Sequence, residues 1–210
     1  MFQNRILKCK LSQDLADIGK LLYEKRLTIA SGGNMSVRSE GSMLITPSGV
    51  CKGMLSAEDM IEIDISSGEI VGEGKPSIET PFHLGIYRSR PDVNAVIHCH
   101  PVFCTVLAIQ GKDLRTNLTP ESLMILGKDV PMIPYDTPGS DGLAEKLISA
   151  MGTNKACIMQ NHGALVVGKN LMDAFFRMET LEYIATLQLK CGEVPGLPED
   201  EIERVLAMSK

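Results

Sequence analysis

Three of the four histidines stand where a metal site would need them. His98 and His100 are separated by one residue at the end of an apolar run, residues 94–97, that predicts a β-strand. Side chains at i and i+2 lie on one face of a strand, so both imidazoles can bind one ion. His162 follows a second strand-like run, residues 157–161. This arrangement suits a transition metal with an open coordination position, as in catalytic zinc sites, although the histidine pair alone is equally consistent with two core histidines.

A carboxylate that could join these histidines is Glu79. It follows Ser77, which we interpret as a helix N-cap, and it precedes apolar residues at helical spacing. We therefore expect Glu79 in the first helical turn, where the helix dipole keeps it ionised and fit to bind a metal or act as a base. An ordinary acidic first-turn residue is the alternative. We interpret His83 as a core or supporting histidine, and Cys99 points to the strand face opposite its histidine neighbours.

A glycine-rich segment, Ser31-Gly32-Gly33-Asn34, could bind an anion. It has neither the spacing of a P-loop nor that of a dinucleotide-binding turn. Glycine lets backbone N–H groups approach an anion closely, and asparagine and serine side chains add neutral donors. Residues 46–49 and the turn at Ser77 offer similar donors. Each segment alone is also consistent with a plain turn, and together they suggest a phosphate pocket.

The composition bounds the class of protein. A chain of 210 residues that is 44% hydrophobic and 22% charged fits one globular domain over residues 1–210. The formal net charge of -5, without a basic run, predicts no nucleic-acid partner and no binding to an anionic membrane. No apolar stretch reaches the length of a transmembrane helix, and residues 1–10 lack a secretory apolar core, so we expect a cytoplasmic protein. Six cysteines without C-x-x-C spacing indicate reduced thiols.

The apolar periodicity predicts alternating runs of helices and strands. A helix over residues 12–27 is followed by a glycine-rich turn at 28–36. Strands are predicted at 43–46, 61–65, 69–71, 93–100, 130–134, 156–160 and 164–167, and helices at 78–89, 102–110, 141–151 and 170–191, with a short helix after residue 200. Strands in succession as well as in alternation with helices favour a mixed, mainly antiparallel sheet with helices on both faces.

Five motifs in register carry a resemblance to the class II aldolase/adducin family. They are residues 33–38 (GNMSVR), 44–49 (LITPSG), 76–79 (PSIE), 90–100 (RPDVNAVIHCH) and 160–163 (QNHG). The match runs in order over nearly the whole chain and is closest to members that cleave L-fuculose 1-phosphate. The resemblance implies a single three-layer α/β/α domain with a mainly antiparallel central sheet, and a homotetramer whose active sites lie between subunits.

The resemblance also implies the roles of individual residues. His98, His100 and His162, completed by Glu79, would bind one Zn²⁺ or another divalent transition metal per chain, and Glu79 would exchange protons with substrate carbon. Substrate phosphate would be bound by Ser31, Gly33, Asn34, Ser48, Gly49 and Ser77. The implied reaction is the reversible, metal-dependent cleavage of a ketose 1-phosphate into dihydroxyacetone phosphate and a small aldehyde.

Three departures from the family pattern leave the reaction open. Thr119 replaces the tyrosine that protonates the aldehyde oxygen, Ile78 replaces a phosphate-binding serine, and the chain ends at Lys210, before the tail that covers the substrate. Tyr135 and Glu121 are candidates for the missing acid. The alternatives within the family are a ribulose-phosphate 4-epimerase, a methylthioribulose-1-phosphate dehydratase and a sugar-acid phosphate decarboxylase. A non-catalytic adducin-like module is a further alternative, but that branch lacks the metal ligands.

Overall fold

The computed structural model describes residues 2–208, so the chain end at Lys210 lies outside the described residues. The helices are α1 (Phe2–Glu24), α2 (Thr80–Ser89), α3 (Val102–Gln110), α4 (Pro120–Leu126), α5 (Asp141–Met151), α6 (Leu171–Cys191) and α7 (Glu199–Met208). The strands are β1 (Asn34–Ser39), β2 (Ser42–Ile45), β3 (Ile61–Asp64), β4 (Ile70–Val71), β5 (Ala95–Cys99), β6 (Met132–Ile133), β7 (Ala156–Met159) and β8 (Gly163–Gly168). Short 3-10 helices occur at Lys52–Met54, Ala57–Asp59 and Thr116–Leu118.

The strands form one eight-stranded sheet in the order β4-β3-β2-β1-β5-β8-β7-β6. Neighbouring strands are antiparallel except β6 and β7, which are parallel. This confirms the prediction of a mixed, mainly antiparallel sheet. The central strand β5 pairs with β1 on one side and β8 on the other, which brings residues near 34, 98 and 165 into one row.

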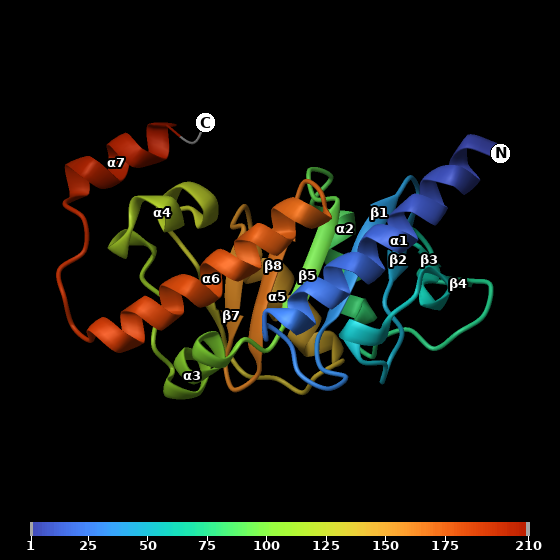
Figure 1. The fold of residues 1–210 in the computed structure, drawn as a ribbon, viewed down its shortest axis with the longest axis horizontal. Coiled ribbons are helices and arrows are strands. Elements are labelled where there is room, and N and C mark those ends of the chain that lie inside the picture. The colour runs from blue at the N-terminus through green and yellow to red at the C-terminus, as the bar shows by residue number, and fades with distance from the viewer. Residues whose placement is uncertain (1, 209–210) are drawn as a thin grey trace.

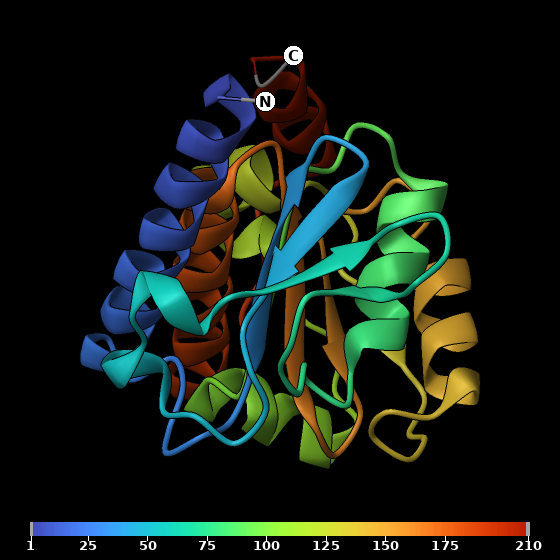
Figure 2. The same cartoon turned by 90° about the vertical axis from the view of Figure 1, so that its right-hand side faces the viewer.

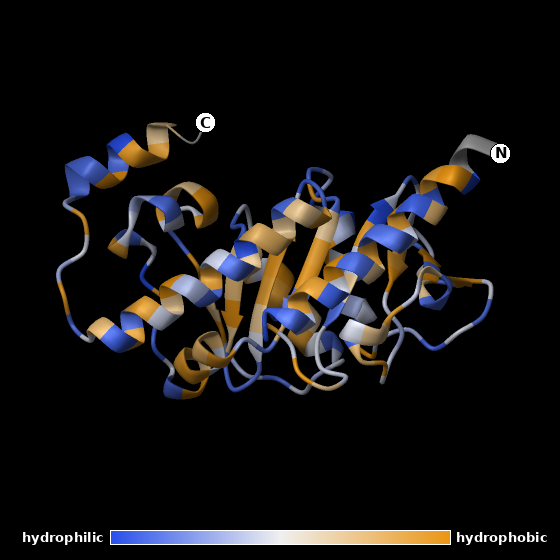
Figure 3. Cartoon of the chain, in the orientation of Figure 1, coloured by the Kyte–Doolittle hydropathy of each residue, from blue (hydrophilic) through white to orange (hydrophobic). Residues whose placement is uncertain are grey.

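Helices cover both faces of the sheet, giving the expected three-layer α/β/α fold (Figures 1 and 2). Helices α1, α3 and α6 pack on one face over a core that includes Leu22, Ile97 and Met178. Helices α2 and α5 pack together on the other face over a core that includes Phe82 and Leu147. The central strands are mainly hydrophobic, whereas the helices in front of them mix hydrophilic and hydrophobic residues (Figure 3). No helix in the described range 2–208 is both long and apolar enough to cross a membrane.

Two predicted boundaries are wrong. Helix α1 begins at Phe2 rather than near residue 12. Residues 2–11 hold no glycine or proline and several good helix formers, so the helix extends through them although their apolar spacing is weak. Strand β1 begins at Asn34, inside the segment predicted as a turn. Asparagine and serine have low strand propensity, and pairing with β2 and β5 on both sides overrides that preference.

Candidate active site

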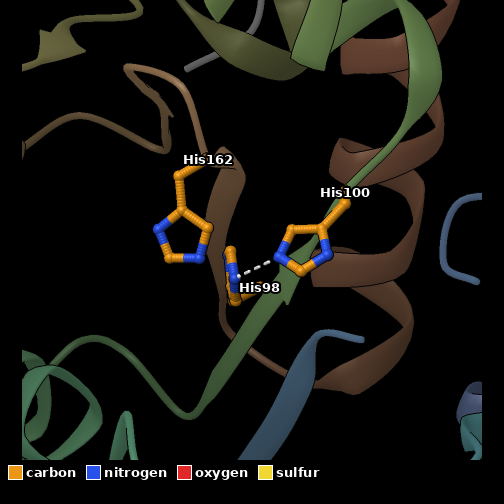
Figure 4. Close-up of side chains that lie close together, drawn as sticks. All are labelled: His98, His100 and His162. Atoms are coloured by element: carbon orange, nitrogen blue, oxygen red, sulfur yellow. Dashed lines mark hydrogen bonds between the residues drawn. The ribbon is translucent and has the colours of Figure 1, made fainter. Parts of the chain in front are cut away.

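The three histidines predicted to bind a metal lie together at one end of the central strands (Figure 4). His98 belongs to β5 and His100 directly follows it, while His162 lies in the tight turn between β7 and β8. That turn needs the left-handed conformation of Asn161, whose φ is 56°. One ligand atom from each imidazole lies within 4.8 Å of the others, and Nε2 of His98 is 3.0 Å from Nε2 of His100. The group could therefore hold a metal ion.

Glu79 lies against the same cluster. Its Oε2 is 3.3 Å from Nε2 of His98, and its Oε1 is 3.3 Å from Nε2 of His162. The prediction that it occupies the first helical turn is wrong by one position, because Glu79 is the N-cap residue and α2 begins at Thr80. Burial acts against the charge that the helix dipole was expected to favour. Only 5% of Glu79 is exposed, and burial raises the pKa of its carboxyl above the ordinary value.

The donor chemistry of this cluster fits a cation. His98 Nδ1 lies 3.0 Å from the carbonyl oxygen of Ala164, to which it can only donate, so Nε2 of the neutral ring carries a lone pair. This lone pair faces Nε2 of His100 and an oxygen of Glu79. A ring nitrogen or a carboxylate oxygen that binds a metal also carries a lone pair and no proton. Within residues 2–208, Glu79 Oε1 is buried without a hydrogen-bond partner. Converging lone pairs in a buried site repel one another unless a cation or protons lie between them.

The histidines are also neutral, as metal binding requires. Burial lowers the pKa of His98 well below its ordinary value and lowers that of His100. Burial, followed by repulsion from His100, lowers the pKa of His162 to about 4. Neutral imidazoles at pH 7 have a lone pair available for a metal ion.

Glycines let the backbone segments around the cluster approach one another. A Cβ on Gly33 would lie 2.5 Å from the carbonyl oxygen of His98, and one on Gly163 would lie 2.5 Å from that of Cys99. The Gly163 Cβ would also lie 2.7 Å from Cδ2 of His100. Both contacts are shorter than side chains tolerate, so β1, β5 and β8 can bring their ends this close only with glycine at these positions.

We expect Gly163→Ala to destabilise the protein by about 1–3 kcal/mol, the usual cost of overpacking a filled site. Because the new methyl group meets the His100 ring, metal affinity should fall as well. Urea unfolding in chelator and competitive metal titration measure the two effects. Gly41→Ala is the control, since a Cβ there meets nothing within 4 Å. Equal stability and affinity in the two variants would contradict this account of the glycine.

The segments suggested to bind phosphate meet beside Glu79. Pro47 bridges Pro76, and the backbone N–H of Ser48 donates to the carbonyl of Lys75, which joins residues 46–49 to residues 75–77. The backbone N–H of Glu79 donates to Ser77 Oγ, and Asn34 Nδ2 donates to Glu79 Oε2 at 2.7 Å. Among the proposed phosphate ligands, Ser31 and Gly49 are exposed and Ser48 and Gly33 are half-buried, whereas Asn34 and Ser77 are buried and already hydrogen-bonded.

One buried residue near these segments escaped the sequence analysis. Lys52 is 2% exposed, and its Nζ donates to the carbonyls of Ser31 and Val50. It therefore ties the glycine-rich segment to the segment after Gly49. Burial lowers the pKa of its ammonium group. A lysine that follows a Pro-Ser-Gly turn suggests a solvated surface residue, so the sequence held no signal for this role.

Thr119 and the two candidates for the missing acid, Glu121 and Tyr135, differ in position. Thr119 caps α4, where its side chain accepts a hydrogen bond from the N–H of Ser122. Glu121 is exposed on the same helix, which lies toward the opposite end of the sheet from α3, the helix that follows His100 (Figures 1 and 2). Tyr135 is 55% exposed, and its backbone N–H donates to the side chain of Gln160, two residues before His162. Of these three residues, Tyr135 is the one that lies next to the metal-binding turn within one chain.

The structure combines a three-layer α/β/α fold with a cluster of histidines and a glutamate that could hold a metal ion. The sequence matches the Class II Aldolase and Adducin N-terminal domain over residues 13–189, and the chain belongs to this family. It is 37% identical to the 3-oxo-tetronate 4-phosphate decarboxylase of Pectobacterium atrosepticum over 185 residues, covering 86% of this chain and 84% of that protein. It is 38% identical to the L-fuculose phosphate aldolase of Methanocaldococcus jannaschii over 172 residues, covering 82% of this chain and 92% of the other.

A solved structure agrees with these relatives. That of an L-fuculose 1-phosphate aldolase superposes with a TM-score of 0.88 at 36% identity, covering 95% of each chain. The family and both kinds of relative make the chain a lyase.

Proposed function

We propose that the chain is a zinc-dependent lyase that breaks a carbon–carbon bond beside the carbonyl of a phosphorylated sugar and releases dihydroxyacetone phosphate. The observation that carries this proposal is the position of Glu79, whose two oxygens lie 3.3 Å from His98 and His162. Three imidazoles and one carboxylate suit zinc, and the carboxylate is the group that a substrate would displace. Ser31, Gly33, Ser48 and Gly49, with Asn34 and Ser77 beside them, would hold the phosphate.

Different residues bind the metal, bind the phosphate and transfer the proton. When bound to His98, His100 and His162, a zinc ion supplies a Lewis acid for the carbonyl oxygen and for the negative charge left by bond cleavage. The phosphate held by the glycine-rich segment fixes the three-carbon fragment relative to Glu79. Glu79 then gives a proton to the carbon that has lost its substituent. Burial raises the pKa of its carboxyl, so this carboxyl holds a proton at a lower cost than an exposed glutamate would.

The primary candidate is an aldolase that acts on a ketose 1-phosphate similar to L-fuculose 1-phosphate. Cleavage leaves an aldehyde, so a proton must leave the substrate hydroxyl as the bond breaks. We propose Tyr135, exposed beside the turn that holds His162, for that transfer: its phenolate would take the hydroxyl proton in cleavage, and its hydroxyl would return a proton to the aldehyde oxygen in the reverse addition. A small aldehyde such as lactaldehyde or glycolaldehyde would be the second product.

The second candidate is a decarboxylase, and Thr119 favours it. Thr119 occupies the position of the family's tyrosine and is engaged in capping α4. Loss of CO₂ from a 3-oxo acid needs no proton transfer at the leaving group, so this reaction tolerates the substitution. A 3-oxo-tetronate 4-phosphate, the substrate in the name of one relative, would lose its carboxyl carbon and leave dihydroxyacetone phosphate. Glu79 would protonate carbon in the same way in both reactions.

A substrate panel separates the candidates. Purified protein loaded with zinc is incubated with ketose 1-phosphates, ketose 5-phosphates and 3-oxo-tetronate 4-phosphate, and dihydroxyacetone phosphate is followed by coupled NADH oxidation. We expect triose phosphate from at least one substrate. Release of an aldehyde identifies the aldolase, and release of CO₂ identifies the decarboxylase. An epimerised or dehydrated product, with no triose phosphate from any substrate, would contradict the proposal and point to the epimerase or the dehydratase.

The active form that we propose is a homotetramer with active sites between subunits. Ile29 and Val102 are 65% and 56% exposed beside the glycine-rich segment and His100, respectively. With Tyr23 they line a groove of about 560 Å³. Exposed apolar side chains gathered in a groove are typical of a surface that a second subunit covers.

A further inference from the structure

A chain of side-chain hydrogen bonds runs from Glu79 into the core between β1 and α2. Asn34 Nδ2 is 2.7 Å from Glu79 Oε2, and Asn34 Oδ1 is 2.6 Å from His83 Nε2. His83 Nδ1 is 2.7 Å from Ser36 Oγ, which is 2.9 Å from the hydroxyl of Tyr87. None of these residues is more than 5% exposed. The carboxylate of Glu79 in turn lies 3.3 Å from Nε2 of His98 and of His162.

The geometry fixes the direction of every hydrogen bond in this chain. The amide nitrogen of Asn34 donates to Oε2 of Glu79. The amide oxygen then faces His83, whose Nε2 must carry the proton. Burial lowers the pKa of His83 to about 3, so the ring is neutral and its Nδ1 accepts. Ser36 therefore donates to Nδ1 and accepts from Tyr87, whose pKa burial raises. All the donors point toward Glu79.

The spacing of these residues along β1 and α2 places them on the two faces that meet. Asn34 and Ser36 lie on one face of β1, at i and i+2, while Glu79, His83 and Tyr87 follow one another at i, i+4 and i+8 along one face of α2 and its N-cap. The surrounding core is apolar and includes Phe82 and Ile86. Burial of polar groups in this core costs free energy, whereas burial of apolar side chains does not. Packing alone therefore does not account for the polar residues of the hydrogen-bond chain.

We propose that His83 is a positioning residue for Glu79. It locks the Asn34 amide with its NH₂ group toward the carboxylate, and Ser36 and Tyr87 lock the His83 tautomer. The inference rests on the proposed role of Glu79 as the proton-transfer group. Without His83 the amide can rotate by 180°, which would turn its oxygen toward the carboxylate and repel it. Glu79 would then lose its fixed orientation toward the substrate carbon while the three imidazoles remain.

The tautomer is tested first, in the metal-free protein and without substrate. Nitrogen-15 NMR of the histidine rings distinguishes a protonated Nε2 from a protonated Nδ1, and loss of one ring's signals in His83→Gln assigns them. We expect a neutral ring with its proton on Nε2. Ser36→Ala removes the donor to Nδ1 and should release the ring into a mixture of tautomers. A proton on Nδ1 in the unaltered protein would overturn the proposal whatever reaction the enzyme catalyses.

Activity is tested with the zinc-loaded enzyme and the substrate found in the panel. We expect His83→Leu to lower kcat by about 10- to 100-fold, as for other residues that orient metal-site groups, with a smaller change in KM and full metal content. His83→Gln keeps a donor for Asn34 and should recover part of the loss. Rescue by glutamine but not by leucine distinguishes positioning of Glu79 from core packing, which both variants disturb.

A matched pair of serines on β1 controls for folding. Ser36 lies in the hydrogen-bond chain, whereas Ser39 is equally buried and its hydroxyl has no partner within residues 2–208. Ser36→Ala should lower kcat and Ser39→Ala should not. If His83→Leu fails to fold, this pair and the NMR result decide the matter. Equal kcat in the two serine variants, or equal kcat in the glutamine and leucine variants of His83, would overturn the proposal.

Discussion

Replacing Glu79 by glutamine should abolish most of the turnover while leaving the fold and most of the bound metal in place. A neutral amide cannot give a proton to substrate carbon, and loss of such a group typically costs on the order of 10² to 10⁴ in rate. The amide oxygen of the substituted side chain can still accept from Asn34, so the hydrogen-bond chain below it survives. Burial disfavours the charge of Glu79, so the neutral side chain should not destabilise the metal-free protein.

Single-turnover rates, metal analysis and thermal unfolding of Glu79→Gln measure these three quantities. Glu145→Gln removes the same charge from an exposed position on α5 and serves as the control. We expect it to match the unaltered enzyme in all three. A Glu79→Gln enzyme with a rate near that of the control would remove this residue from the mechanism.

The second large effect is loss of the metal from His98→Ala, His100→Ala and His162→Ala. Each change removes one of the imidazoles that converge on the site. Two imidazoles and a carboxylate bind zinc more weakly than three imidazoles and a carboxylate. The purified variants should contain much less than one zinc per chain and should show no turnover. Elemental analysis and a chromogenic chelator give the stoichiometry.

Cys99→Ala is the control for these variants, because Cys99 lies between two of the histidines but packs into the core on the α1 and α6 face. It should keep its zinc although it loses a buried sulfur. Full metal content in all three histidine variants would contradict the site, and loss of metal from Cys99→Ala as well would mean that the strand rather than the imidazoles controls binding.

The elements predicted well are those with a strong period. Apolar residues recur every three to four positions in residues 141–151 and 171–191. Both segments are helices, and their bounds lie within one residue of the predicted ones. The start of strand β1 was predicted wrongly because several of its residues are polar and face a buried site. Its sequence is Asn-Met-Ser-Val-Arg-Ser. Its strand conformation comes from ladders to β2 and β5, and a local pattern does not contain that information.

The site was predicted in part for a similar reason. The i, i+2 spacing of His98 and His100 is a local signal, and the structure brings both to His162. The burial of Glu79 is not local, since it depends on β1 and β5 packing against the start of α2. The dipole argument therefore did not include the burial that raises the pKa of its carboxyl. Lys52 acts through a contact to a residue 21 positions away, which no spacing rule could reveal. The position of His83 one turn after Glu79 indicated a core or supporting histidine, but not its contact with Asn34, 49 positions away.

The proposed metal ligands lie on different parts of the molecule from Thr119 and Ile78, the expected departures from the family, and from Tyr135, the candidate acid. His98 belongs to the central strand β5, and His162 lies in the short turn between β7 and β8, so sheet pairing holds both of them. Ile78 and Tyr135 are exposed on connecting segments, and Thr119 caps a helix outside the sheet. Because loops tolerate substitution better than paired strands, selection can exchange one leaving group for another without disturbing the ligand geometry. Aldol cleavage and decarboxylation would then be neighbouring evolutionary outcomes of one scaffold, a few loop substitutions apart.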